Sequence, residues 1–208
     1  MSGKGSTKGK SPVIVVAGEG DNDRQVLRHL IRAVRQDAKI LNIKKKTALR
    51  LADKELTPRV NEIRRLAQVA AARSELTGIV VHVDLDTVDE DQYVRVRARI
   101  GAELRKAFSC PSALALAAWE TEAWLMQFPA AFGKVNAGWV LKDRYRGCDL
   151  SKVHDPKKRL KEHSWKPPYE ESDAPRVMEN ALGSDGKLLV PDGKNRSFEE
   201  FMAELTRW

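Results

Sequence analysis

Three short, nearly uninterrupted runs of apolar residues stand out along the chain. They are Val13–Ala17, Ile79–Val83 and Ala113–Ala118, and each is followed by polar positions. Such runs are typical of strands that are buried on both faces of a sheet. The stretch Lys39–Leu51 is ambiguous, because its few apolar positions are compatible with a further short strand before a basic cluster. The pattern therefore predicts three strands and leaves a fourth open.

Between these runs, apolar positions recur every three or four residues, as on the buried face of an amphipathic helix. In one segment, Asp91–Phe108, strand-like alternation competes with the helical period. Its length favours a helix, because strands rarely exceed about 10 residues. The predicted helices are Arg24–Arg35, Arg59–Arg73, Asp91–Phe108, Glu120–Gln127, Pro156–His163 and Ser197–Arg207.

Strands that alternate with helices predict right-handed crossovers and a mostly parallel sheet with helices on both faces. We therefore expect an α/β, Rossmann-like domain over residues 12–132. Residues 1–11 are polar and basic, which predicts a disordered tail. Residues 133–208 carry a weaker pattern with loops rich in Pro and Gly, which predicts a small helical and irregular C-terminal extension that packs on the same domain.

The length of 208 residues is typical of one domain with an appendage. The longest apolar run, Ala113–Trp119, has seven residues. Since a membrane-spanning helix needs about 20, we expect no membrane span. The first residues also lack the apolar segment of a secretory signal, so we expect a cytoplasmic protein.

Charge is distributed unevenly along the chain. There are 37 Lys and Arg residues against 29 Asp and Glu residues, a formal net charge of +8, which suggests a polyanionic partner. The segment Arg24–Arg73 holds 14 basic and four acidic residues, whereas Glu75–Gln92 holds six acidic residues and no Lys or Arg. A solvated helix face explains the arginines equally well. The candidate nucleic-acid-binding residues are Arg24, Arg28, Lys44, Lys45, Lys46 and Lys166.

All three predicted strands end in carboxylates. These are Glu19 and Asp23 after the first strand, Asp84 and Asp86 after the second, and Glu120 and Glu122 after the third. In an open α/β sheet the carboxyl ends of the strands share one edge, so these acids should converge. Any single pair at a strand end is more often a helix cap or a solvated loop than a set of ligands.

Converging carboxylates repel one another unless protons or a cation balance them. An all-oxygen ligand set suits Mg²⁺ or Mn²⁺. Asp84 and Asp86 lie two residues apart, and in an extended segment both would face one crevice. His82 lies inside the same apolar run and is interpreted as a buried, hydrogen-bonded core residue.

The order and spacing of these motifs resemble a known domain. A strand, then Glu19-Gly20-x-x-Asp23 opening a helix, then a strand ending in Asp84-x-Asp86, resembles the Toprim domain of topoisomerases, bacterial primases and OLD-type nucleases. A further resemblance, to a small stand-alone Toprim-like family of unknown function, comes from the segments Trp119–Leu125, Asp155–Lys158, Tyr169 and Ser197–Phe201.

The resemblance implies a Toprim-like fold and a role for each acid. Glu19, Asp84 and Asp86 would be the catalytic, metal-binding acids. Asp23, Glu120 and Glu122 would be additional metal ligands of the nuclease type. One position departs from the pattern, because the third acid of topoisomerase-like Toprim domains is replaced here by Val88. That departure favours a phosphodiester hydrolase over a topoisomerase or primase.

The leading hypothesis is a nuclease that uses Mg²⁺ or Mn²⁺, with one or two ions, and acts on DNA rather than RNA. The resemblance also implies an SMC-like ATPase as partner, in prokaryotic genome defence. Two alternatives remain. The first is a non-catalytic module that binds nucleic acid or the ATPase. The second is a Mg²⁺-dependent phosphotransfer enzyme that acts on nucleotides.

Overall fold

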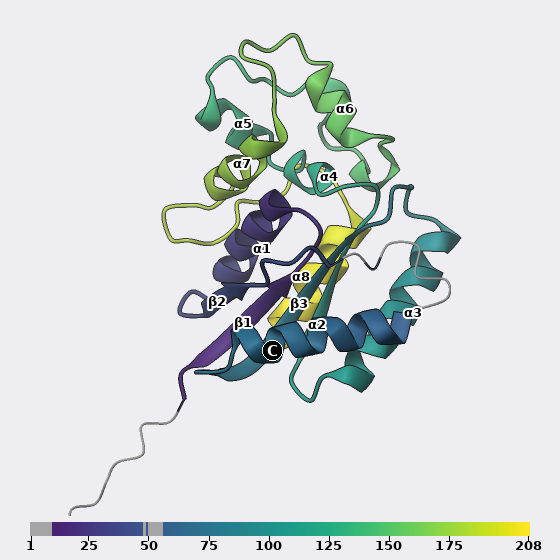
Figure 1. Cartoon of the computed structure of the whole chain (residues 1–208). Coiled ribbons are helices and arrows are strands. Elements are labelled where there is room, and N and C mark those ends of the chain that lie inside the picture. Colours follow the sequence, from purple (N-terminus) through teal and green to yellow (C-terminus); the bar gives the residue numbers. More distant parts are fainter. Residues whose placement is uncertain (1–9, 48, 50–55) are drawn as a thin grey trace, which may run out of the picture.

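A computed structural model describes residues 10–47, 49 and 56–208 (Figure 1). Most of the predicted tail over residues 1–11, and the end of the ambiguous stretch Lys39–Leu51, lie outside the described residues. No helix in the described part of the chain combines the length and the apolarity needed to cross a membrane.

The sheet has four parallel strands in the order β2-β1-β3-β4. The strands are β1 Pro12–Ala17, β2 Lys39–Asn42, β3 Glu75–Asp84 and β4 Ser112–Ala117. The predicted parallel α/β architecture is therefore confirmed, and the ambiguous stretch contains a strand. The specific Toprim identity of the fold stays a prediction.

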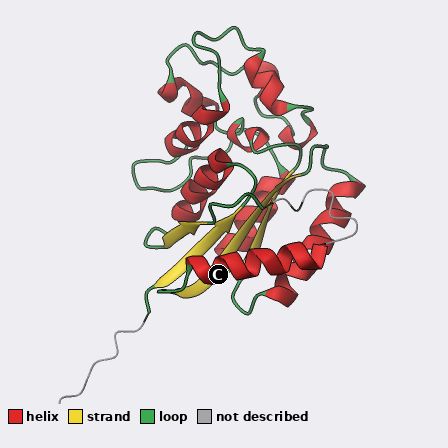
Figure 2. Cartoon of the chain, in the orientation of Figure 1, coloured by secondary structure: helices red, strands yellow, loops and turns green. Residues whose placement is uncertain are grey.

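Eight α-helices are present among the described residues. They are α1 Asp21–Val34, α2 Leu56–Ala70, α3 Asp91–Ala107, α4 Glu122–Leu125, α5 Pro129–Val135, α6 Pro156–Lys161, α7 Ala174–Asn180 and α8 Arg196–Thr206. Three short 3₁₀ helices lie in the C-terminal part, η1 Asp143–Tyr145, η2 Leu150–Lys152 and η3 Glu171–Asp173. Figure 2 shows helices on both faces of the sheet.

The structure corrects several predicted boundaries. The helix α2 begins at Leu56 rather than after Pro58. A proline is tolerated there because the N–H groups of a first helical turn have no partner within the helix. The helix predicted over Glu120–Gln127 shrinks to the single turn α4, and Pro129 begins α5 instead of ending a helix. The prediction also missed α5 and α7, which are each seven residues long.

Alternating residues of β1 enter two separate cores. Ile14 and Val16 face a cluster that includes the buried residues of α1 and most of the C-terminal region. Val13 and Val15 face the second cluster, with α2 and α3. This follows from the period of two along a strand. Residues 133–208 thus contribute their apolar side chains to the same core as one face of the sheet.

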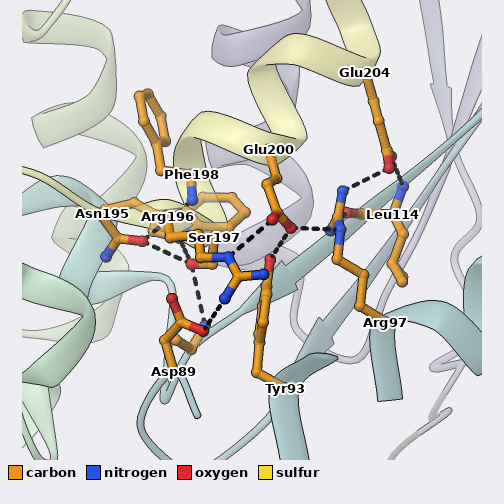
Figure 3. A network of polar contacts seen from close by, with 12 residues as sticks. Asp89, Tyr93, Arg97, Leu114, Asn195, Arg196, Ser197, Phe198, Glu200 and Glu204 are labelled. Carbon is orange, nitrogen blue, oxygen red and sulfur yellow. Dashed lines mark hydrogen bonds and ion pairs between the residues drawn. The ribbon is translucent and has the colours of Figure 1, made fainter. Parts of the chain in front are cut away.

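The helix α8 covers the free edge of β4 (Figure 3). The backbone N–H of Leu114 donates to Glu204 Oε2 at 2.8 Å, and that of Ala118 donates to Ser197 Oγ at 3.2 Å. Arg97 of α3 donates to the Leu114 carbonyl at 3.1 Å. Because unpaired edge strands promote association with other chains, these contacts protect the sheet.

Candidate metal centre

The loops that follow β1, β3 and β4 meet at one edge of the sheet, because parallel strands have their carboxyl ends on the same side. The loop after β1 carries Glu19 and leads into α1 with Asp23 in its first turn. The strand β3 itself carries His82 and ends at Asp84. The loop after β4 carries Thr121.

Asp23, His82 and Asp84 form a compact group, in which one ligand atom from each lies within 4.8 Å of the others. His82 Nε2 is 3.3 Å from Asp84 Oδ1, and His82 Nδ1 is 4.0 Å from Asp23 Oδ2. His82 is fully buried, and both carboxylates are about one-fifth exposed. Solvent can therefore reach the two carboxylates of the group but not the imidazole.

Thr121 connects the histidine to the first of these acids. Its hydroxyl donates to Asp23 Oδ1 at 3.1 Å, and its oxygen lies 3.0 Å from His82 Nε2. A hydroxyl has a single proton to donate, so the hydrogen of the second contact belongs to Nε2. The bond therefore assigns a proton to Nε2 and leaves Nδ1 as the nitrogen that faces Asp23.

The electrostatic environment of His82 is strongly anionic. Burial lowers the pKa of the imidazole, but the carboxylates of Asp84, Asp23 and Glu19 outweigh that effect and raise the pKa to about 9. With no metal bound, His82 is thus protonated at neutral pH and balances part of the acidic charge.

Several polar atoms in this region are buried and have no hydrogen-bond partner. They include Glu19 Oε1, His82 Nδ1 and Asp84 Oδ1. An unpartnered buried polar atom costs on the order of 1–3 kcal/mol. Two oxygens and one nitrogen of this kind, beside a further carboxylate from Asp23, match the ligand types of a divalent cation. The carboxylates fit the predicted Mg²⁺ or Mn²⁺, whereas an imidazole nitrogen is a ligand that other divalent metals prefer, so the identity of the metal stays a prediction.

The two acids after β4 have partners of their own. Glu120 pairs with Lys157 Nζ at 3.1 Å and accepts the backbone N–H of the same residue at 3.2 Å. Glu122 is buried and accepts a hydrogen bond from the Tyr169 hydroxyl at 3.3 Å. Burial raises the pKa of Glu122 to about 8, although Lys157 opposes the shift. Their role as metal ligands stays a prediction.

The prediction that Asp86 and Asp84 face the same crevice needs a correction. The expectation that it faces the same way as Asp84 required an extended backbone, but β3 ends at Asp84 and Asp86 has a φ of 55°. Trp119 also has a positive φ, 61°, and accepts the N–H of Asp86 at 3.1 Å. Left-handed conformations of such residues cost on the order of 1–3 kcal/mol and cluster at functional sites. Asp86 as a ligand stays a prediction.

The placement of Arg24 on the solvent face of α1 was wrong. Its side chain is buried and donates to the Gly18 carbonyl at 2.8 Å. It also lies 3.3 Å from Asp21. Arg24 therefore holds the loop that carries Glu19, and its side chain is not at the surface, where the predicted contact with a nucleic acid would need it.

The other predicted nucleic-acid-binding residues lie at the surface. Arg28 is partly exposed on α1, and Lys45 is exposed but forms an ion pair with Glu62 of α2. Lys166 is exposed, whereas the neighbouring Trp165 is buried and stacks on Trp139 at a ring-centroid distance of 5.3 Å. Trp165 therefore belongs to a packed loop. The remaining exposed residues of the predicted set are Lys44 and Lys46.

Two glycines allow the acidic loop to approach the sheet. A Cβ at Gly20 would lie 2.2 Å from Asp23 Oδ2, and one at Gly18 would lie 3.0 Å from the Cβ of His82. The first distance is far below any van der Waals contact. The Glu-Gly-x-x-Asp motif thus needs its glycine because the carboxylate of Asp23 folds back over that position.

His82 and Thr121 are the site residues that the sequence analysis did not assign to the site. His82 is buried and hydrogen-bonded, as predicted, but it also lies among the acids. A signal was present, because His82 precedes Asp84 by two residues in a strand and so points to the same side. No comparable signal marks Thr121, whose contacts depend on how the loop after β4 folds.

The fold and the site define a class of protein. It is a parallel α/β protein with a buried histidine and two or more carboxylates at the carboxyl edge of its sheet. In comparisons with protein-family models, curated proteins and solved structures, nothing matches the chain. The argument for function therefore rests on the residues of the site.

Proposed function

We propose that the protein is a Mg²⁺- or Mn²⁺-dependent nuclease that hydrolyses phosphodiester bonds. One observation supports this most directly. Asp23, His82 and Asp84 lie together at the edge of the sheet where α/β proteins bind ligands, the charge of Glu19 acts on the same histidine, and buried atoms of Glu19, His82 and Asp84 have no hydrogen-bond partner. Such a set favours a bound divalent cation over an empty site.

The chain's own residues have distinct parts in this proposal. Glu19, Asp23 and Asp84 would hold the cation, which when bound lowers the pKa of water and neutralises charge on phosphate oxygens. Thr121 orients Asp23 through its hydrogen bond. His82 lies close enough to hold Asp84 in place by their ion pair. The acids of this centre therefore arrive in a fixed arrangement, which limits the reorganisation needed when substrate binds.

The charge of the chain supports a polyanionic substrate. The net charge is +8, although the edge of the sheet gathers acids. A basic body around an acidic crevice attracts a polyphosphate and leaves the crevice free for a cation. We extend the Toprim resemblance to this centre, favour DNA as substrate in the cytoplasm, and expect an SMC-like ATPase as partner in genome defence.

The direct test is cleavage of plasmid DNA, linear DNA, single-stranded DNA and RNA by the purified protein, with Mn²⁺, with Mg²⁺ and with EDTA. We expect cleavage of at least one substrate with metal and none with EDTA. Asp84→Asn and Asp23→Asn should each abolish it. The matched control is Asp37→Asn, which removes an exposed carboxylate outside the candidate centre. Equal cleavage by all three variants would reject the proposed centre.

A second candidate function is a non-catalytic nucleic-acid-binding module with the same fold. The observation that favours it is the raised pKa of His82, because an imidazolium balances the acids without any metal. Nucleic-acid binding that is unchanged by EDTA, with no cleavage of any substrate, would support this function over the nuclease.

A further inference from the structure

A second polar pocket lies beside the candidate metal centre, between α1 and the edge strand β2, which are neighbours in Figure 1. Its volume is about 410 Å³. The residues that line it are Asp21, Gln25, Arg28, His29, Arg32 and Asn42. Five of these six come from consecutive turns of α1, so one face of a single helix forms most of the wall.

The positive charges in this pocket are not balanced. Arg28 and Arg32 lie one turn apart on α1, a spacing that places the Cβ atoms about 6 Å apart and at which like charges destabilise a helix. Neither makes an ion pair or a hydrogen bond with any residue that the structure describes. The carboxylate of Asp21 is already used, because it accepts from Gln25 at 2.9 Å and pairs with Arg24 at 3.3 Å.

Two further polar groups line the pocket, the imidazole of His29 and the side-chain amide of Asn42. Burial lowers the pKa of the His29 imidazole; Glu179 opposes this effect, and the charges of Arg32 and Arg28 add to it. A neutral imidazole keeps one N–H to donate. Asn42, the last residue of β2, has a buried side-chain oxygen with no hydrogen-bond partner. The pocket thus combines two free guanidinium groups, an imidazole and an amide.

These groups match a phosphate. Guanidinium groups bind phosphate oxygens through paired N–H donors, and a neutral imidazole supplies one further N–H. The amide of Asn42 can add only its NH₂ donors, because its unpartnered Oδ1 is an acceptor. An anion placed between Arg28 and Arg32 would also remove their mutual repulsion. Among the described residues, no carboxylate of the chain occupies the position between Arg28 and Arg32. The pocket is therefore suited to an anion that is not part of the protein.

The location of the pocket relates it to the candidate metal centre. It begins at Asp21, two residues before Asp23 on the same helix. It also includes the carboxyl end of β2, which is two strands away from β3 in the sheet. Adjacent strands lie about 4.8 Å apart, so the ends of β2 and β3 are separated by roughly 10 Å along the edge. Arg28 and Arg32 follow Asp23 by five and nine residues on α1, which places them roughly 8 and 14 Å from it along the helix axis. One extended nucleic-acid strand can therefore contact both.

We propose that the pocket formed by Gln25, Arg28, His29, Arg32 and Asn42 binds a backbone phosphate that flanks the phosphodiester bond to be cut. This inference rests on the proposed nuclease function and adds the second contact that fixes the register of the substrate. The pocket holds the strand, and the acids at the ends of β1 and β3 receive the scissile phosphate.

The test compares two double variants that remove the same charge. Arg28→Ala/Arg32→Ala empties the pocket. Arg73→Ala/Arg105→Ala removes two exposed arginines near the opposite, amino-terminal edge of the sheet, where α2 is followed by β3 and where α3 ends. Binding of fluorescein-labelled DNA duplex, single strand and RNA is measured by anisotropy in EDTA at several salt concentrations, so that cleavage does not interfere.

We expect the pocket variant to bind at least about tenfold more weakly than the wild type and to lose about one unit of salt dependence, as for one phosphate contact. The control should stay within about twofold. An equal loss in both variants would overturn the proposal, because affinity would then follow net charge alone. Unchanged binding by the pocket variant, or no binding by the wild type, would also overturn it.

A second measurement reports on the pocket without any nucleic acid. Inorganic phosphate should shift the imidazole resonances of His29, one of four histidines, which His29→Gln assigns. The shift should disappear in Arg28→Ala/Arg32→Ala. If the wild type shows pocket-dependent binding but no metal-dependent cleavage, the nuclease proposal fails and the phosphate pocket stands. If the wild type cleaves DNA and the two double variants bind DNA with equal affinity, the phosphate-pocket proposal is rejected and the nuclease proposal is retained.

Discussion

The candidate metal centre and the polar network between α3, β4 and α8 both gather charged side chains, most of them partly exposed, but they balance those charges differently. In the network each acid has a basic partner (Figure 3). Arg97 pairs with Glu200 at 2.7 Å and also with Glu204, and Arg196 pairs with Glu200 at 2.9 Å and with Asp89 at 3.5 Å. In the metal centre, Asp23, Asp84 and Glu19 share a single histidine.

This difference separates two uses of clustered charge. A network in which acids and bases alternate stabilises the position of α8, because Glu200 and Glu204 also accept hydrogen bonds from the Tyr93 hydroxyl and the Leu114 N–H. A group of acids with one base and several unpartnered atoms stores unfavourable free energy that a ligand can release. We therefore expect substitutions in the network to change stability and substitutions in the centre to change metal binding and activity.

The largest expected effect is on metal binding by Asp84→Asn. For the wild type, Mn²⁺ at 100 times its dissociation constant should raise the unfolding free energy by about 2.7 kcal/mol. Asp84→Asn should lose nearly all of this gain, and cleavage should fall by at least about 100-fold. Thermal unfolding with Mn²⁺ and with EDTA measures the first effect. A full Mn²⁺ response in the variant would contradict the assignment of the centre.

Glu204→Ala should show the opposite behaviour. The change leaves the N–H of Leu114 without its acceptor and removes one of the two carboxylates that pair with Arg97, which costs on the order of 2–3 kcal/mol of unfolding free energy. The Mn²⁺ response should be preserved. Glu199→Ala is the control, because Glu199 is exposed on the same helix and should cost less than about 0.5 kcal/mol. Urea denaturation of the three proteins distinguishes these outcomes.

The sheet was largely predictable from the sequence because its strands are buried on both faces. The run Val13–Ala17 has no polar residue, so its burial is visible in the pattern itself. The start of β3 was missed, since Glu75 and Thr77 are polar although they extend the strand at its amino-terminal end. Short helices such as α7 depend on packing against α1 and carry too few turns to show a period.

The candidate centre was predictable only in part, for a different reason. The parallel direction of the strands brings Asp23 and Asp84 to one edge, and this direction was predicted from the alternation of strands and helices. The order of the strands was not predicted. The partners of Glu120 and Glu122 could not be inferred, because Lys157 and Tyr169 come from the distant C-terminal region. Arg24 was misplaced because its hydrogen bond to Gly18 is a tertiary contact that helical periodicity does not reveal.

Glu122 belongs neither to the polar network nor to the group of Asp23, His82 and Asp84. Its protonation should make the stability of the protein depend on pH. Its pKa is raised to about 8 in the folded protein, above the ordinary value of 4.5. The folded state therefore binds the proton more tightly, and this contribution to stability is full below about pH 4.5 and is lost as pH rises through about 8.

We therefore expect the unfolding free energy of Glu122→Gln to fall less than that of the wild type between pH 5 and pH 8.5. Urea denaturation at both pH values measures the difference. The exposed residue Glu199 supplies the matched control Glu199→Gln, which should keep the wild-type pH dependence. If Glu122→Gln loses as much stability as the wild type over this range, the carboxyl is already ionised at neutral pH.

The smallest expected effect tests whether the network tolerates the loss of one neutral hydrogen bond. The Tyr93 hydroxyl donates to Glu200 Oε2 at 2.8 Å, and Glu200 keeps its pairs with Arg97 and Arg196 when that donor is removed. Tyr93→Phe leaves no buried polar atom without a partner, so it should cost only about 1 kcal/mol of unfolding free energy. A loss as large as that of Glu204→Ala in urea denaturation would show that the network depends on every member and not on its charge pairs.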